Sequence, residues 1–203
     1  MKNKFKKILK GYNLFRQKYV FDDQSIMQSL SFHGQKPQIM VIACCDSRVD
    51  PALILQCNPG DLFVVRNVAN IVPPYEKDEA HHGTSAALEF GIRVLKIKNL
   101  ILLGHSQCGG IDALLHGSNS KKNDFITNWV SVIKNQGTMH QHVDNYAKSA
   151  LKQSLRNCLS FPWIKEKVIK ETLIIHLWFF DIKTGQIFTY SAKHKRYKPL
   201  NIV

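Results

Sequence analysis

Two short motifs in this chain carry thiols and an imidazole. Residues 44–48 are Cys-Cys-Asp-Ser-Arg, and much further along the chain residues 105–108 are His-Ser-Gln-Cys. Two cysteine thiolates and one histidine form a three-ligand set for zinc, and three protein ligands leave the fourth tetrahedral position open for water or substrate. We therefore predict a catalytic zinc site held by Cys44, His105 and Cys108.

A carboxylate and a guanidinium lie next to the first of these cysteines. Asp46 is two residues from Cys44, so it can reach the open metal position, either as a ligand or as a hydrogen-bond partner of bound water. Arg48 is two residues further on and can hold Asp46 in a bidentate pair away from the metal. The alternative is a salt bridge that only closes a turn.

Short apolar runs place both motifs at the ends of strands. Residues 39–43, 62–65 and 100–103 are continuous apolar runs, which are typical of parallel strands buried on both faces. In open α/β sheets, ligands bind beyond the carboxyl ends of the strands. The first and third strands would therefore bring Cys44 together with His105 and Cys108. We predict an α/β fold with a mostly parallel central sheet flanked by helices.

Helices and a C-terminal strand complete the predicted fold. A helix is expected to follow Asp22 and Asp23 and to end near Gly34, and another is expected to begin with Ser160 as its cap. A turn at 181–185 leads to an antiparallel edge strand at 186–190. Periodicity indicates further helices at 5–19, 84–96, 111–115, 125–135 and 143–157, and a strand at 172–180.

Length and composition fit one domain. The chain has 203 residues, of which 44% are hydrophobic, so it can bury a core of its own. We divide it into an N-terminal helical arm (1–34), a catalytic core (35–191) and a basic tail (192–203). The five cysteines are irregularly spaced, which argues against a disulfide framework. No signal-peptide core follows the basic start, and we expect a cytoplasmic protein.

The net charge of +13 suits nucleic acid, an anionic membrane or an anionic small substrate. Because the charge is spread along the chain and clusters at both ends, we interpret it mainly as solvated surface charge. We expect no nucleic-acid partner and no stable membrane association. A zinc-stabilised module that binds nucleic acid remains an alternative, although no recognition motif accompanies the basic residues.

Further stretches resemble one known family. Together with the two motifs, residues 60–70, 73–75, 83–90, 160–163 and 180–185 are similar to the β-class carbonic anhydrases, especially their plant-type branch. The resemblance covers about residues 30–191. It implies reversible hydration of carbon dioxide to bicarbonate and a proton, by attack of zinc-bound hydroxide, with one Zn²⁺ per subunit on Cys44, His105 and Cys108. It also implies an Asp46–Arg48 catalytic dyad, with Asp46 on the metal only in a closed form.

The resemblance also implies substrate and subunit contacts. Gln35 corresponds to a substrate-binding glutamine contributed by the neighbouring subunit. Phe63, Val68 and Phe90 correspond to the apolar wall that receives carbon dioxide, and the N–H of Gly109 to a bicarbonate contact. A homodimer or a dimer-based higher oligomer is expected, with the N-terminal helices packed on a partner subunit.

This chain departs from the family pattern at three positions. Cys45 stands where a small serine or alanine is usual, Phe90 where plant members have tyrosine, and Leu177 where a glycine is common. His81 and His82 are interpreted as loop or interface residues rather than ligands. Hydrolysis of carbonyl sulfide or carbon disulfide on the same metal set is a further alternative.

Overall fold

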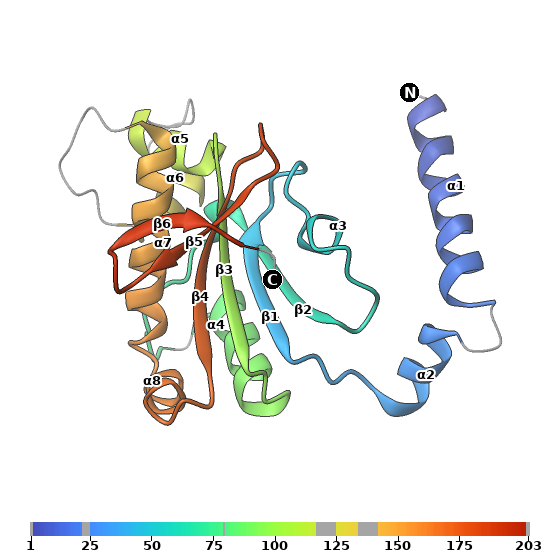
Figure 1. Ribbon diagram of the computed structural model, residues 1–203, viewed down its shortest axis with the longest axis horizontal. Coiled ribbons are helices and arrows are strands. Elements are labelled where there is room, and N and C mark those ends of the chain that lie inside the picture. Colours follow the sequence, from blue (N-terminus) through green and yellow to red (C-terminus); the bar gives the residue numbers. More distant parts are fainter. Residues whose placement is uncertain (1, 22–24, 79, 117–124, 134–141, 202–203) are drawn as a thin grey trace.

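In the part of the chain that the structure describes, six strands form one sheet in the order β2-β1-β3-β4-β5-β6 (Figure 1). β1 lies between β2 and β3, and β3 lies beside β4; all three of these pairs are parallel. The mostly parallel sheet predicted from the apolar runs is therefore confirmed. The strands are β1 (Ile39–Cys44), β2 (Leu62–Asn67), β3 (Asn99–His105), β4 (Ile174–Phe180), β5 (Ile187–Ser191) and β6 (Arg196–Pro199).

The structure is a computed structural model that describes residues 2–21, 25–78, 80–116, 125–133 and 142–201. Its α-helices lie where they were predicted, except for the short α3, which was not predicted. A 3₁₀ turn, η1 (Val68–Asn70), follows β2, and a π-helical segment, η2 (Phe90–Val94), continues α4 through most of the predicted helix 84–96. The helices are α1 (Lys2–Tyr19), α2 (Ile26–His33), α3 (Pro51–Ile54), α4 (Gly83–Glu89), α5 (Gly109–His116), α6 (Phe125–Val130), α7 (Val143–Cys158) and α8 (Pro162–Ile169).

The main core lies on one face of the sheet. Alternate residues of the strands, such as Met40, Ile42 and Leu102, are fully buried there against helices that include α4 and α7. The opposite face has a smaller cluster of strand side chains among the described residues: Val41, Ala43, Ile101 and Leu103. This alternation along each strand is what a sheet buried on both faces requires.

The C-terminal end of the sheet has two antiparallel strands. β5 pairs with β4, as predicted, but β6 lies beyond it and forms the edge. Residues 196–199 fall within the predicted basic tail (192–203) but form this edge strand. Its lysine, arginine and proline content suits an edge, because such residues discourage pairing with another chain.

Two predicted helix starts are wrong or outside the described residues. Asp22 and Asp23 lie outside the described residues; α2 is capped instead by Ser25, whose Oγ accepts from the N–H of Gln28 at 3.1 Å. Phe161, not Ser160, occupies the cap position of α8. The Ser160 hydroxyl instead accepts from the N–H of Tyr75 at 2.8 Å and donates to a carbonyl of α7.

The N-terminal helix stands clear of the sheet (Figure 1). Its apolar stripe is largely exposed: the exposed fractions of Phe5, Ile8 and Tyr12 are 64%, 66% and 57%. Near the end of the helix, the hydroxyl of Tyr19 donates to Asn58 at 3.3 Å. No helix among the described residues is long and apolar enough to cross a membrane.

Candidate metal centre

The two motifs meet at the carboxyl edge of the sheet, where the strand order reverses. β1 ends at Cys44, and its parallel neighbour β3 ends at His105. Cys108 follows after a short turn and immediately precedes α5, where its carbonyl accepts the first helical hydrogen bond, from Asp112. The predicted convergence of Cys44, His105 and Cys108 is present: their ligand atoms all lie within 4.8 Å of one another.

The donor atoms suit a tetrahedral metal ion. The sulfurs of Cys44 and Cys108 are 4.0 Å apart. Two thiolates on one tetrahedral zinc, each at about 2.3 Å, lie about 3.8 Å apart, whereas a disulfide needs about 2.05 Å. All three side chains are buried, with exposed fractions of 5% or less. The site therefore fits zinc in spacing, donor type and exclusion of solvent.

The orientation of His105 gives an independent test of this fit. Its Nδ1 is 2.8 Å from the carbonyl of Ser106, so Nδ1 carries the proton and donates. Nε2 then has a free lone pair, and among the described residues it is a buried side-chain nitrogen without a hydrogen-bond partner. An unpartnered buried polar atom is costly, and a metal ion satisfies it.

The two thiols affect each other's ionisation. The hydrogen bond with Cys108 lowers the pKa of Cys44, aided by His105 and opposed by burial. The same pair raises the pKa of Cys108, with burial acting in the same direction. The pairing therefore favours loss of a proton from Cys44, and the thiolate is the form that binds metal. Backbone N–H groups of Asp46 and Ala69 also lower the pKa of Cys44.

Asp46 is held by Arg48 through three hydrogen bonds. Its Oδ1 accepts from the backbone N–H of Arg48 at 2.9 Å and from Nε at 3.0 Å, and its Oδ2 accepts from Nη2 at 2.7 Å. These bonds with Arg48 hold the pKa of the Asp46 carboxyl well below its usual range. Arg48 in turn reaches across to the carbonyl of Gln107 at 3.3 Å, joining the two motifs.

Arg66 is a supporting residue that the sequence reasoning did not find. From the end of β2 it donates to the carbonyl of Cys44 at 2.9 Å and to that of Asp46 at 2.7 Å, and it pairs with Asp50 at 2.9 Å. It therefore fixes the backbone between the ligand and the carboxylate. An arginine directly after the apolar run 62–65 was the available signal.

The predicted substrate residues fall into two groups. Val68 and Gly109 lie beside the metal cluster. Gly109 directly follows Cys108, and Val68 directly follows Asn67, which pairs with Cys44. The two segments are close, since a Cβ on Gly110 would lie 2.7 Å from Val68 Cγ1. Phe63 lies level with Met40 in the sheet, four residues before the Cys44–Asn67 pair. This is roughly 13 Å away along the strands. Phe90 lies against Phe63, with ring centroids 5.9 Å apart.

Gln35 belongs to the second group. It is exposed and precedes β1, so it lies at the amino end of that strand, whereas Cys44 ends it. Within one chain, therefore, Gln35, Phe63 and Phe90 are separated from the metal cluster. Phe90 is also 43% exposed, which leaves part of its ring available to another molecule.

An apolar pocket of about 370 Å³ adjoins the metal centre. Val68 lines it together with Cys45, which follows Cys44 of the metal cluster and is exposed. Asn67 also lines it, but its amide is engaged by the backbone of Ile71 at 2.8 and 2.9 Å. The remaining lining residues are Phe125, Ile126 and Trp129 of α6.

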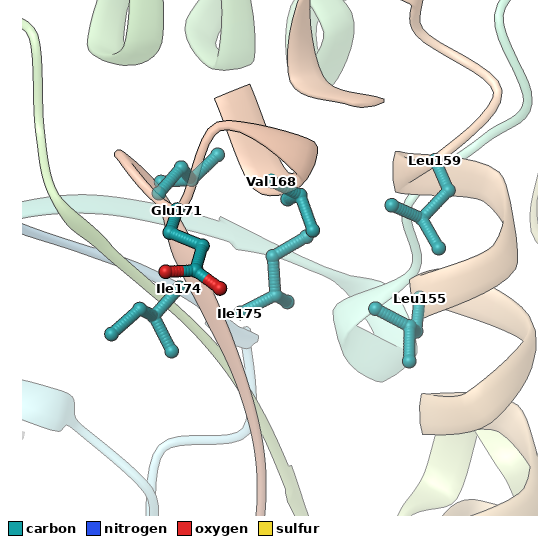
Figure 2. A pocket seen from close by; sticks show the side chains of 7 residues that line it. Leu155, Leu159, Val168, Glu171, Ile174 and Ile175 are labelled. Carbon is teal, nitrogen blue, oxygen red and sulfur yellow. The ribbon is translucent and has the colours of Figure 1, made fainter. Parts of the chain in front are cut away.

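A larger pocket of about 620 Å³ lies at the other end of the sheet (Figure 2). It opens between α7, α8 and the start of β4, and its lining is leucine, isoleucine and valine with one carboxylate, Glu171. It contains none of the predicted site residues. His82 is not part of the Cys44–His105–Cys108 cluster. Its Nε2 pairs with Asp78 at 2.6 Å, on a loop that also carries Glu76.

Comparison with known proteins agrees with this geometry. The carbonic anhydrase family profile matches residues 39–187. Beta carbonic anhydrase 3 of Arabidopsis thaliana is 35% identical over 210 residues, covering 91% of this chain and 81% of the plant protein. A carbonic anhydrase of Synechocystis is also 35% identical, covering 92% of this chain and 71% of its own.

Solved structures lead to the same family. The β-carbonic anhydrase CcaA superposes with a TM-score of 0.87 at 30% identity, over 98% of this chain and 93% of its own. One of two tetrameric β-carbonic anhydrases of Sordaria macrospora superposes with a TM-score of 0.74 at 28% identity, over 98% of each chain. The chain therefore belongs to the β-class carbonic anhydrase family, a family of lyases.

Proposed function

We propose that this chain catalyses the reversible hydration of carbon dioxide to bicarbonate and a proton, with one zinc ion per subunit on Cys44, His105 and Cys108. The observation that carries the proposal is the buried cluster of these three donors beside the Asp46–Arg48 pair, with His105 Nε2 making no hydrogen bond to any residue that the structure describes. When bound, zinc supplies a Lewis acid that makes hydroxide available near neutral pH.

Asp46 is suited to orient the attacking water. Because the pKa of its carboxyl is lowered by Arg48, it stays ionised at neutral pH and can only accept hydrogen bonds. Arg48 holds both of its oxygens, so the direction of the remaining lone pairs is set. A closed form, with Asp46 on the metal, would have to break these bonds. We therefore propose an open site as the resting arrangement.

The start of α5 is suited to bind the product, bicarbonate. The N–H groups of the first turn of a helix have no partner within the helix and favour anions. Gly109 begins α5, and a Cβ built on it would meet nothing within 4 Å, so its backbone is approachable. We propose that its N–H receives bicarbonate, while Val68 forms the apolar side that receives carbon dioxide.

A second copy of the chain would complete the apolar wall. Gln35, Phe63 and Phe90 lie at the end of the sheet away from the metal cluster of their own chain. We propose a homodimer, or a dimer-based higher oligomer, in which these residues face the partner's site. The exposed stripe of α1 supports such packing, because burying each large apolar side chain is worth about 1.5–3 kcal/mol.

The free thiol ligands support a cytoplasmic location, since a reducing compartment preserves them. The spread of positive charge supports neither a nucleic-acid partner nor stable membrane association, and we propose carbon dioxide and bicarbonate as the small-molecule partners. Sedimentation of the protein with and without residues 1–20 tests the assembly.

Stopped-flow hydration of carbon dioxide, together with zinc stoichiometry, tests the proposed reaction. The wild-type protein should bind one zinc per subunit and hydrate carbon dioxide, and Cys44→Ser should lose both properties. Cys57→Ser is the matched control, because Cys57 is only partly buried and lies outside the metal cluster; it should keep both. Zinc binding with hydrolysis of carbonyl sulfide or carbon disulfide but no hydration would contradict the proposal.

A further inference from the structure

One peptide group links the histidine of the metal cluster to a carboxylate on another helix. The carbonyl of Ser106 accepts from Nδ1 of His105 at 2.8 Å. The N–H of the same peptide group belongs to Gln107, and it donates to Oδ1 of Asp144 at 2.7 Å. Asp144 lies in the first turn of α7, 37 positions further along the chain. This peptide group therefore makes a hydrogen bond on each of its two sides.

The two hydrogen bonds cannot be set independently. The peptide bond is planar and trans, so the carbonyl of Ser106 and the N–H of Gln107 point in opposite directions and turn as one unit. Whatever holds the N–H toward Asp144 thus also holds the carbonyl toward the ring of His105. Because Nδ1 then carries the proton, Nε2 keeps the lone pair that a metal ion needs.

The turn that carries this peptide needs support from outside. Gln107 has φ 54°, in the left-handed region that is uncommon for a residue with a side chain. Reversing the peptide before Gln107 would return its φ to negative values, just as such a reversal converts a type II turn into a type I turn. The reversal would also point the Ser106 carbonyl away from His105. The bond to Asp144 opposes it, because the reversal would take the N–H away from the carboxylate.

The other groups of the turn are held by different residues. The N–H of Ser106 donates to the carbonyl of Phe180 at 2.9 Å, and its hydroxyl accepts from the N–H of Ile182 at 2.9 Å. The carbonyl of Gln107 accepts from Arg48 at 3.3 Å. The peptide between Ser106 and Gln107 is thus the part of the turn whose orientation depends on Asp144.

Helix α7 is a firm support for this carboxylate. Its buried residues include Leu151, which packs on Gly104, the residue directly before His105. The contact is close, since a Cβ on Gly104 would lie 3.0 Å from Leu151 Cδ1. The start of a helix also favours a negative charge in its first turn. The side chain of Asp144 is 26% exposed, which limits competition from water for its oxygens.

We propose that Asp144 is a positioning residue of the metal centre: its carboxylate holds the 106–107 peptide so that the Ser106 carbonyl keeps the imidazole of His105 in its metal-binding tautomer and orientation. The inference rests on the proposed function only in taking His105 as a metal ligand. Histidines that bind metal usually donate their second N–H to a carboxylate or a carbonyl, and loss of such support typically weakens metal binding about 10–100-fold. Here the carbonyl contacts the ring, and the carboxylate acts through the carbonyl.

Two substitutions of Asp144 test this together. Asp144→Ala removes the acceptor, so zinc affinity, measured by competition with a chelating dye, should fall about 10-fold or more. Asp144→Asn keeps an oxygen acceptor without the charge, so it should retain most of the affinity. If Asp144→Ala does not fold, Asp144→Leu replaces it, since leucine is close to aspartate in shape but has no acceptor.

The cobalt-substituted protein gives a second measurement. The Nδ1 proton of a histidine bound to cobalt gives an NMR signal far outside the usual proton range, and this proton exchanges with water. The signal should be sharp in the wild type and in Asp144→Asn. It should broaden by faster exchange in Asp144→Ala, because the proton of His105 would lose its carbonyl partner when the peptide turns.

Asp61→Ala is the matched control. The Oδ2 of Asp61 accepts from the backbone N–H of Asn58 at 2.7 Å, so this variant removes an equally short bond between a carboxylate and the backbone. Asp61 directly precedes β2, at the end of the sheet away from the metal cluster. Its substitution should change neither zinc affinity nor the proton signal of the cobalt protein.

Wild-type zinc affinity and an unchanged proton signal in Asp144→Ala would overturn the proposal, even if its stability fell, because Asp144 would then only support the fold. An equal loss of affinity in Asp144→Asn and Asp144→Ala would also overturn it, since the loss would follow the charge rather than the hydrogen bond. In either case the wild-type protein would still hydrate carbon dioxide, and the proposed function would stand. A wild-type protein that binds neither zinc nor cobalt would instead overturn the proposed function, together with the role of Asp144.

Discussion

Replacing Gly110 by alanine tests how tightly the helix that follows Cys108 packs on the turn after β2. A Cβ at this position would lie 2.7 Å from Val68 Cγ1 and 3.0 Å from Ala69 Cβ. Neither neighbour yields easily, because Val68 is β-branched and the Cβ of Ala69 is fixed by its backbone. The next atom, Ala69 N at 3.3 Å, belongs to the backbone of the turn and cannot move aside on its own.

The expected cost follows from two opposing effects. Overpacking of this kind destabilises a protein by about 1–3 kcal/mol. Alanine is also a better helix former than glycine, by up to about 1 kcal/mol within a helix. We expect Gly110→Ala to lose about 1–2 kcal/mol of unfolding free energy. In a chain of this length, each kcal/mol lowers the melting temperature by about 2–4 °C.

Gly109→Ala is the matched control, because it changes the neighbouring residue of the same helix and nothing lies within 4 Å of its Cβ. It should be as stable as the wild type or up to about 1 kcal/mol more stable. Thermal unfolding of the zinc-loaded proteins is compared at one protein concentration, since assembly makes the melting temperature depend on concentration. Equal stability of the two variants would refute the close packing of α5 on the turn.

Three further perturbations test the site, the core and the arm. Asp46→Asn should retain one zinc per subunit but lower kcat about 100-fold or more, as removal of an acid–base group does; full activity would remove Asp46 from the mechanism. Burial raises the pKa of Cys158 from 9.0 to about 12, so the unfolded chain loses this proton first as pH rises. Above pH 9 the free energy of unfolding of the wild type should therefore fall more steeply than that of Cys158→Ala, by up to about 1.4 kcal/mol per pH unit. Denaturant unfolding at several pH values measures both, and parallel pH profiles would contradict this. Deletion of residues 1–20 should lower the sedimentation coefficient to that of a smaller assembly, and unchanged assembly would exclude packing of the arm on a partner.

The convergence of Cys44, His105 and Cys108 was predictable because it depends on local patterns. Buried parallel strands appear as continuous apolar runs, and the carboxyl ends of parallel neighbours meet at one edge of the sheet. Cys44 and His105 end two such strands, so their meeting required no detailed packing. The Asp46–Arg48 pair is also local, since its members are two residues apart.

The supporting contacts were not predictable in the same way. Trp129 reaches Val68 across 61 positions, from a helix whose predicted range, 125–135, extends beyond the described α6. Arg66 contacts two backbone carbonyls at and just after the end of β1. Every residue has a backbone carbonyl, so the sequence does not indicate which of them a side chain will contact. The edge position of β6 likewise depends on a hairpin within a stretch whose charge had indicated a tail.

The separation of the substrate residues follows from the same geometry that brings the ligands together. In parallel strands, residues at the same register lie at the same height, so Asn67 is level with Cys44 while Phe63 is level with Met40. The roughly 13 Å along the strands between Phe63 and the level of Cys44 is more than a side chain can span. If Phe63 and Phe90 belong to the wall that receives carbon dioxide, that wall must therefore serve the site of another copy. A monomer would keep the three proposed zinc ligands, Asp46 and Arg48, but it would then lack one side of the proposed substrate pocket. Assembly and turnover should then be lost together, while zinc binding persists.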